Sequence, residues 1–145
     1  MTVTGGCRCG ASRYTLALEM LPPVYCCHCR DCQTWSGSAF TMQGVVGEDE
    51  VAGEGPIVTY AFTNPSGSIS TQYICGTCHT RLWNVNSARP QLRIIRAGTL
   101  DDSDRLEPRA HIWVKRKQPW VALPDGVPAF AEAPPPAEFF ALLTR

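Results

Sequence analysis

The sequence predicts an all-β fold made of a single domain. Seven segments are rich in β-branched or aromatic residues or alternate between apolar and polar positions, which is typical of half-buried strands. Glycine, proline and asparagine separate these segments, whereas signals for long helices are scarce. The 145 residues are 44% hydrophobic, so the chain can bury a core of its own.

The expected strands follow one another closely along the chain. They are residues 12–18, 39–46, 57–62, 68–75, 80–85, 91–97 and 110–115. The glycine-rich stretch 44–55 and the run Asn64-Pro65-Ser66-Gly67 are expected turns, and residues 100–108 are an expected loop. One helical turn is expected between Cys29 and Trp35. Beyond residue 124 the chain becomes proline-rich, and we expect this end to wrap the surface.

The charge balance argues against a nucleic-acid partner. Thirteen basic residues balance thirteen acidic ones, whereas nucleic-acid binding needs a basic face that displaces counterions from phosphate. No run approaches the ~18 apolar residues of a membrane span, and no secretory signal precedes the first cysteines. We therefore expect a cytoplasmic protein without a nucleic-acid or membrane partner.

Eight cysteines form three groups with the spacings C-x-C, C-C-x-C-x-x-C and C-x-x-C. In a reducing compartment, clustered cysteines bind metal more often than they form disulfides. Linking Cys7 to Cys9, or Cys26 to Cys27, would also force a strained ring. The pattern therefore predicts zinc.

Ligand counting favours two different zinc sites. The outer pairs, Cys7 with Cys9 and Cys75 with Cys78, provide the four ligands that structural zinc requires. The middle group, Cys27, Cys29 and Cys32, provides three ligands, as catalytic zinc sites do, and leaves one position for water or substrate. The alternative is that Cys26, His28 or His79 provides a fourth ligand to the second zinc ion, which would make that site structural as well. Cys26 is an awkward ligand, because neighbouring side chains of an extended strand point to opposite faces.

The cysteines lie within longer motifs: Gly6-Cys7-Arg8-Cys9-Gly10, Cys27-His28-Cys29-Arg30-Asp31-Cys32, Ser36-Gly37-Ser38-Ala39-Phe40 and Cys75-Gly76-Thr77-Cys78. Together with segments 97–101 and 111–113, these motifs resemble the glutathione-dependent formaldehyde-activating enzyme family. The resemblance covers most of the chain.

The resemblance implies a β-tent (Mss4-like) fold built from antiparallel sheets that zinc clamps together. It implies a zinc-binding domain of this family over residues 1–128. The composition beyond that domain predicts a proline-rich C-terminal tail, 129–145, that packs on it. The resemblance also implies two zinc ions, a structural one on the outer pairs and a catalytic one on the middle group.

The activity that the resemblance implies is a carbon–sulfur lyase reaction. A thiol such as glutathione and an aldehyde such as formaldehyde would form or release S-(hydroxymethyl)glutathione. Cys27, Cys29 and Cys32 would act as ligands of the catalytic zinc, and His28 is a candidate for proton transfer. Two alternatives remain open: a non-catalytic zinc-stabilised binding module, and a redox sensor whose middle cysteines release zinc on oxidation.

Overall fold

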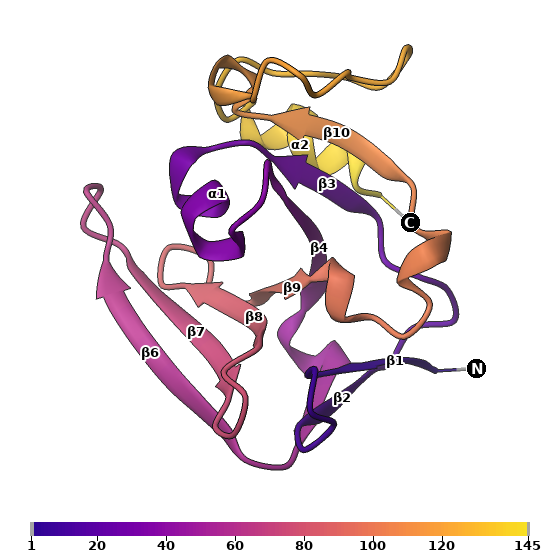
Figure 1. Cartoon of the computed structure of the whole chain (residues 1–145), viewed down its shortest axis with the longest axis vertical. Coiled ribbons are helices and arrows are strands. Elements are labelled where there is room, and N and C mark those ends of the chain that lie inside the picture. The colour runs from indigo at the N-terminus through magenta and orange to yellow at the C-terminus, as the bar shows by residue number, and fades with distance from the viewer. Residues whose placement is uncertain (1, 145) are drawn as a thin grey trace. The chain divides into compact units, whose positions relative to one another are not determined.

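The computed structural model describes residues 2–144 and confirms the all-β class (Figure 1). Ten strands and two short α-helices form within these residues. The chain divides into two compact units that alternate along the sequence. The first unit contains Met1–Pro22 and Val45–Arg105, and the second contains Pro23–Gly44 and Leu106–Arg145.

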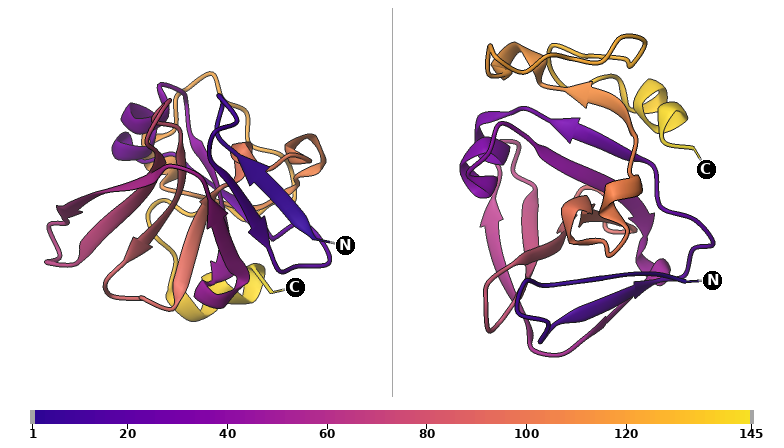
Figure 2. Two further views of the ribbon diagram at one scale, coloured as in Figure 1. Left: turned by 90° about the horizontal axis from the view of Figure 1, so that it is seen from below. Right: turned by 45° about the vertical axis from the view of Figure 1, so that its right-hand side comes forward.

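The first unit contains two antiparallel arrangements of strands (Figure 2). One has the order β1-β2-β5, with strands Val3–Gly6, Arg13–Leu16 and Val51–Glu54. The other has the order β9-β8-β7-β6, with strands Leu92–Arg96, Arg81–Asn86, Ile69–Cys75 and Ile57–Thr63. Short 3-10 turns at Glu48–Glu50, Ala97–Thr99 and Ser103–Arg105 connect these elements.

Aromatic side chains connect the two arrangements within the core of the first unit. Tyr14 of β2 is buried, and its ring meets the edge of the Trp83 ring of β8 at 5.8 Å. The Trp83 ring also stacks on Tyr73 of β7, its register partner, at 5.1 Å. Because edge-to-face and stacked pairs are the favoured aromatic arrangements, these contacts fix β2 against β8 and β7.

The second unit is built around β3, Val24–Cys27. β3 pairs with β4, Thr41–Gly47, in the antiparallel sense and with β10, Pro108–Ile112, in the parallel sense. The parallel β3–β10 pair is an exception to the antiparallel sheets that the resemblance implies, because a long connection returns the chain to β3 in the same direction. Helix α1, Arg30–Ser36, follows β3, the 3-10 turn Val114–Arg116 follows β10, and helix α2, Pro136–Leu142, ends the unit.

All seven expected strands overlap strands of the structure, but three further strands are absent from the expectation. Each of these strands has only four residues, too few to show a clear strand pattern. In addition, β1 contains two glycines, β5 lies in the glycine-rich stretch, and β3 follows two prolines. The expected strand 110–115 ends early, at Ile112. Trp113 has a φ of 58°, which turns the backbone into the left-handed region and ends the pairing.

Residues near the C-terminus contact β10 and β3. Phe130 donates its backbone N–H to the His111 carbonyl at 2.9 Å, and His111 donates to the Pro128 carbonyl at 2.9 Å. In α2 the Phe139 ring meets the Tyr25 ring at 4.8 Å and nearly at right angles. No helix among residues 2–144 is long and apolar enough to cross a membrane.

Candidate metal centres

Four cysteines of the first unit form a compact group, the outer cluster: Cys7, Cys9, Cys75 and Cys78. Cys7 and Cys9 lie in the turn after β1, Cys75 ends β7, and Cys78 lies in the turn before β8. All four Sγ atoms lie within 4.8 Å of one another, with 3.5 Å between Cys7 and Cys9 and 3.9 Å between Cys9 and Cys75. Zinc–sulfur bonds of about 2.3 Å in a tetrahedron place sulfurs about 3.8 Å apart, so the outer cluster fits a zinc ion.

Backbone and hydroxyl groups around the outer cluster favour thiolates. The N–H of Ser12 points to Cys7 Sγ at 3.3 Å, and that of Cys78 points to Cys75 Sγ at 3.5 Å. The Thr80 hydroxyl, 3.1 Å from Cys78 Sγ, together with hydrogen bonds from the Thr80 and Cys9 backbones, lowers the pKa of Cys78 to about 5. Since metal binding requires deprotonated sulfur, these contacts prepare the cluster for a cation.

His79, directly after Cys78, is strained. Its φ is 62°, in the left-handed region that glycine occupies without cost, and its side chain is exposed. We expect His79→Gly to raise the free energy of unfolding by about 0.5 kcal/mol. The substitution relieves about 1 kcal/mol of backbone strain, and this gain exceeds the free energy lost because glycine makes the unfolded chain more flexible. Urea denaturation measures the change. His79→Ala keeps a Cβ atom and is the control without gain; a less stable glycine variant would contradict the expectation.

Three cysteines of the second unit form the middle cluster: Cys27, Cys29 and Cys32. Cys27 ends β3, Cys29 is the N-cap residue of α1, and Cys32 lies in the first turn of that helix. The backbone N–H of Cys32 donates to Cys29 Sγ at 3.3 Å, so the thiol takes the usual place of an N-cap oxygen. The helical turn expected from the C-x-x-C spacing is confirmed, and it brings both sulfurs together.

No fourth cysteine or histidine among residues 2–144 joins the middle cluster. His28 and His79 lie outside the group, and so does Cys26. Cys26 is 1% exposed, and burial raises its pKa to about 11, so it remains a neutral thiol in the core. The described cluster therefore offers three protein ligands.

The chemistry of the middle cluster fits a soft divalent cation. Hydrogen bonds of the Cys27 thiol with Cys29 and Cys32 raise the pKa of Cys27, and burial and the repulsion between close thiolates raise it further. A cation removes that repulsion and favours all three thiolates. The Gln43 amide N–H also points to Cys32 Sγ at 3.5 Å and can stabilise negative charge there. Three thiolates with one open position are a donor set that suits zinc.

Glutamine side chains hold the loop between Cys27 and Cys29. Gln33 donates its amide N–H to the His28 carbonyl at 2.8 Å and to the Arg116 carbonyl at 2.9 Å. The His28 backbone N–H donates to the Ile112 carbonyl at 3.0 Å. The sequence carries no signal for Gln33 or Gln43, because glutamine has no characteristic spacing and its partners are distant along the chain.

The imidazole of His28 faces His111 and lies outside the sulfur group. Its Nε2 lies 2.9 Å from His111 Nδ1, and its ring lies 5.1 Å from that of Phe40. Both histidines are buried, and neither His28 Nδ1 nor His111 Nε2 has a hydrogen-bond partner among residues 2–144. Burial, aided by the charges of His111 and Lys117, lowers the pKa of His28 to about 4, and burial also lowers that of His111.

The lowered pKa of His28 makes stability depend on pH. In the unfolded chain histidine titrates near pH 6.5, so between that value and about pH 4 the unfolded state binds more protons. The contribution of neutral His28 to the free energy of unfolding is complete above pH 6.5 and declines as the pH falls toward 4. Between pH 7.5 and 5, we expect the native sequence to lose about 1–2 kcal/mol of unfolding free energy that His28→Asn does not lose. Urea titrations at both pH values test this, and equal losses would contradict it.

Comparison with known proteins gives consistent matches. The family described as glutathione-dependent formaldehyde-activating enzyme matches residues 2–116. A Halomonas elongata protein is 27% identical over 128 residues, which are 85% of this chain and 82% of that protein. Its name assigns it provisionally to the same enzymes. A crystal structure of a Rhodobacter sphaeroides protein has a similar fold, with a TM-score of 0.54 and 16% identity, covering 73% of this chain and 92% of that one. The chain belongs to the glutathione-dependent formaldehyde-activating enzyme family.

Proposed function

We propose that this protein is a zinc-dependent carbon–sulfur lyase that forms or cleaves a thiol–aldehyde adduct such as S-(hydroxymethyl)glutathione. The observation that carries the proposal is the three-sulfur middle cluster. A site with three protein ligands keeps a position for a reactant, whereas a four-thiolate site is closed. Family membership supports glutathione and formaldehyde as the reactants.

The two clusters receive different roles in this proposal. Cys7, Cys9, Cys75 and Cys78 hold a structural zinc ion that joins two turns of the first unit. Cys27, Cys29 and Cys32 hold the catalytic zinc ion. When bound there, zinc would favour the thiolate form of a substrate thiol at neutral pH.

The proposed reaction joins the thiol sulfur to the aldehyde carbon. As the carbon–sulfur bond forms, the carbon–oxygen π bond becomes a lone pair on oxygen, and the proton lost by the thiol ends on that oxygen. In the reverse direction the carbon–sulfur bond breaks and the proton returns to sulfur. Holding both reactants close together lowers the entropic part of the barrier.

Residues around the middle cluster keep its geometry fixed. Gln33 and the Ile112 carbonyl fix the backbone of His28, and the Cys32 N–H fixes Cys29 Sγ. Because the His28 imidazole is buried against His111 and Phe40, we assign His28 to positioning this loop and not to proton transfer. Gln43 donates toward Cys32 and orients that sulfur.

Exchange spectroscopy tests the proposal directly. The zinc-loaded protein is mixed with glutathione and formaldehyde, and NMR follows exchange between the free thiol and the S-hydroxymethyl adduct. We expect faster exchange than in buffer, and no acceleration by protein in which Cys29 is replaced by serine. An exchange rate equal to that of buffer, with two zinc ions bound per chain, would overturn the lyase and favour a zinc-stabilised binding module.

A further inference from the structure

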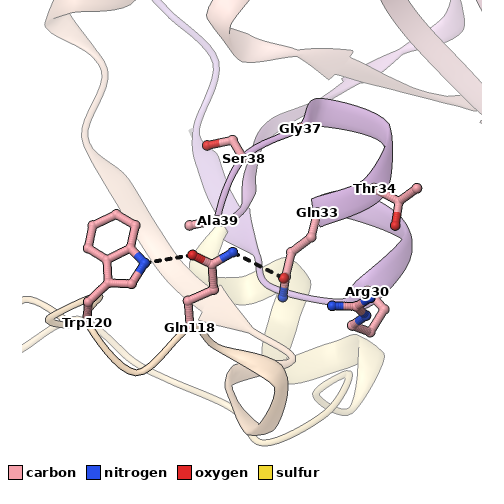
Figure 3. A pocket seen from close by; sticks show the side chains of 8 residues that line it. All are labelled: Arg30, Gln33, Thr34, Gly37, Ser38, Ala39, Gln118 and Trp120. Atoms are coloured by element: carbon pink, nitrogen blue, oxygen red, sulfur yellow. Dashed lines mark hydrogen bonds between the residues drawn. The ribbon is translucent and has the colours of Figure 1, made fainter.

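A pocket of about 460 Å³ lies in the second unit, beside α1 (Figure 3). One wall is the helix, and the other is formed by Gln118 and Trp120 after the 3-10 turn. The polar and aromatic side chains that line it are those of Arg30, Gln33, Thr34, Ser38, Gln118 and Trp120.

The pocket wall is hydrogen-bonded to the loop of the middle cluster. Trp120 donates its indole N–H to Gln118 Oε1 at 2.6 Å, and Gln118 donates its amide N–H to Gln33 Oε1 at 3.4 Å, as Figure 3 shows. Gln33 in turn donates to the carbonyl of His28, which lies between two cysteines of the cluster. The pocket and the metal ligands are therefore parts of one connected structure.

The lining of the pocket suits an anion. Arg30 is its one charged side chain, and no carboxylate lines it. No hydrogen bond or ion pair joins the Arg30 guanidinium to another residue that the structure describes, so its donors are available. Trp120 is 75% exposed although its N–H is held by Gln118, so the indole face is open to a ligand. A guanidinium with neutral polar and aromatic neighbours is a common partner for a carboxylate.

The spacing along the chain suits a short thiol peptide. Arg30 directly follows Cys29, and consecutive Cα atoms lie about 3.8 Å apart. An extended tripeptide spans about 10 Å, so a thiol on its middle residue and a carboxylate at its end are separated by roughly half that length. Arg30 is thus the cation next in sequence to a ligand of the middle cluster, where the carboxylate of such a molecule would need a partner.

We propose that the pocket binds the glycyl carboxylate of glutathione, with Arg30 as its charged partner and Trp120 covering the glycine. This rests on the proposed function, because that function places the thiol at the middle cluster. The other end of glutathione carries an ammonium group beside its carboxylate, and the pocket offers that ammonium no carboxylate partner. The glycyl end has no such group, so it is the end that fits.

Binding of S-methylglutathione tests the pocket without requiring catalysis. The methylated sulfur cannot release a thiolate, and both carboxylates are retained. Calorimetry compares the zinc-loaded native protein with the variants Arg30→Gln and Arg109→Gln. Arg109 lies on β10 in the same unit and donates to the Thr144 carbonyl, so its variant carries the same charge change outside the pocket. We expect about tenfold weaker binding to Arg30→Gln and less than twofold change for Arg109→Gln.

The glycinamide form of S-methylglutathione identifies the carboxylate involved. It should bind the native protein about tenfold more weakly and should lose nothing further with Arg30→Gln, because the two changes remove the same contact. Native-strength binding to Arg30→Gln, additive losses, or no binding by the native protein would each overturn the pocket assignment. Intact, Arg30-dependent binding without accelerated exchange between glutathione and formaldehyde would overturn the lyase and leave the pocket standing.

Discussion

Cys75→Ala is expected to unfold the first unit and to release the zinc ion that we propose for the outer cluster. Cys75 is fully buried at the end of β7, and the outer cluster joins two turns whose cysteines, Cys9 and Cys75, are 66 residues apart in sequence. Structural zinc contributes on the order of 10 kcal/mol in small zinc-binding domains, which is comparable to the whole net stability of a domain. Removing one of four ligands therefore removes most of what opposes unfolding.

Circular dichroism and zinc analysis measure both parts of this result. We expect loss of the cooperative thermal transition of the first unit and a fall of at least one zinc equivalent per chain. Cys26→Ala is the matched control, because it also removes a buried sulfur but one outside both clusters. It should keep both zinc ions and cost about 1–2 kcal/mol from the small cavity. A folded Cys75→Ala protein with full zinc content would contradict the structural role of the outer cluster.

Cys29→Ser is expected to keep the fold while losing the second zinc ion and the activity. Serine accepts the N–H of Cys32 as a normal N-cap residue, so α1 keeps the capping contact that Cys29 Sγ now makes. Its hydroxyl is a poor ligand for zinc compared with thiolate. We expect adduct exchange to slow by on the order of 100-fold or more, with little change in melting temperature.

Cys29→Ala distinguishes the contribution of Cys29 as a helix N-cap from its contribution as a metal ligand. It should lose the same zinc ion and activity but melt earlier than Cys29→Ser, since loss of an N-cap costs about 1 kcal/mol. Mild chelation of the native protein should likewise remove one zinc equivalent first and leave the fold intact. Unfolding of either Cys29 variant as complete as that of Cys75→Ala would show that the division into structural and catalytic clusters is wrong.

Local sequence patterns predicted much of the fold, but they missed the shortest strands and the pairing of segments that are distant in sequence. Strands β6 to β9 are rich in β-branched and aromatic residues, and they form where expected. β1, β3 and β5 have only four residues each, and their pairing partners rather than their own composition stabilise them. The parallel pairing of β3 with β10 has no local signature, because parallel strands are joined by distant parts of the chain.

The sequence by itself determined which cysteines lie together within each motif, whereas tertiary structure brings the C-x-C motif and the distant C-x-x-C motif into one four-sulfur cluster. The C-x-C and C-x-x-C spacings bring sulfurs to one side of a turn through local backbone geometry alone, and counting the ligands separates four from three. Tertiary structure alone decided what surrounds the three. The contacts of His28 with His111 and of Gln33 with Arg116 each join residues 83 positions apart. Such contacts depend on how the elements pack, and no spacing in a sequence encodes them.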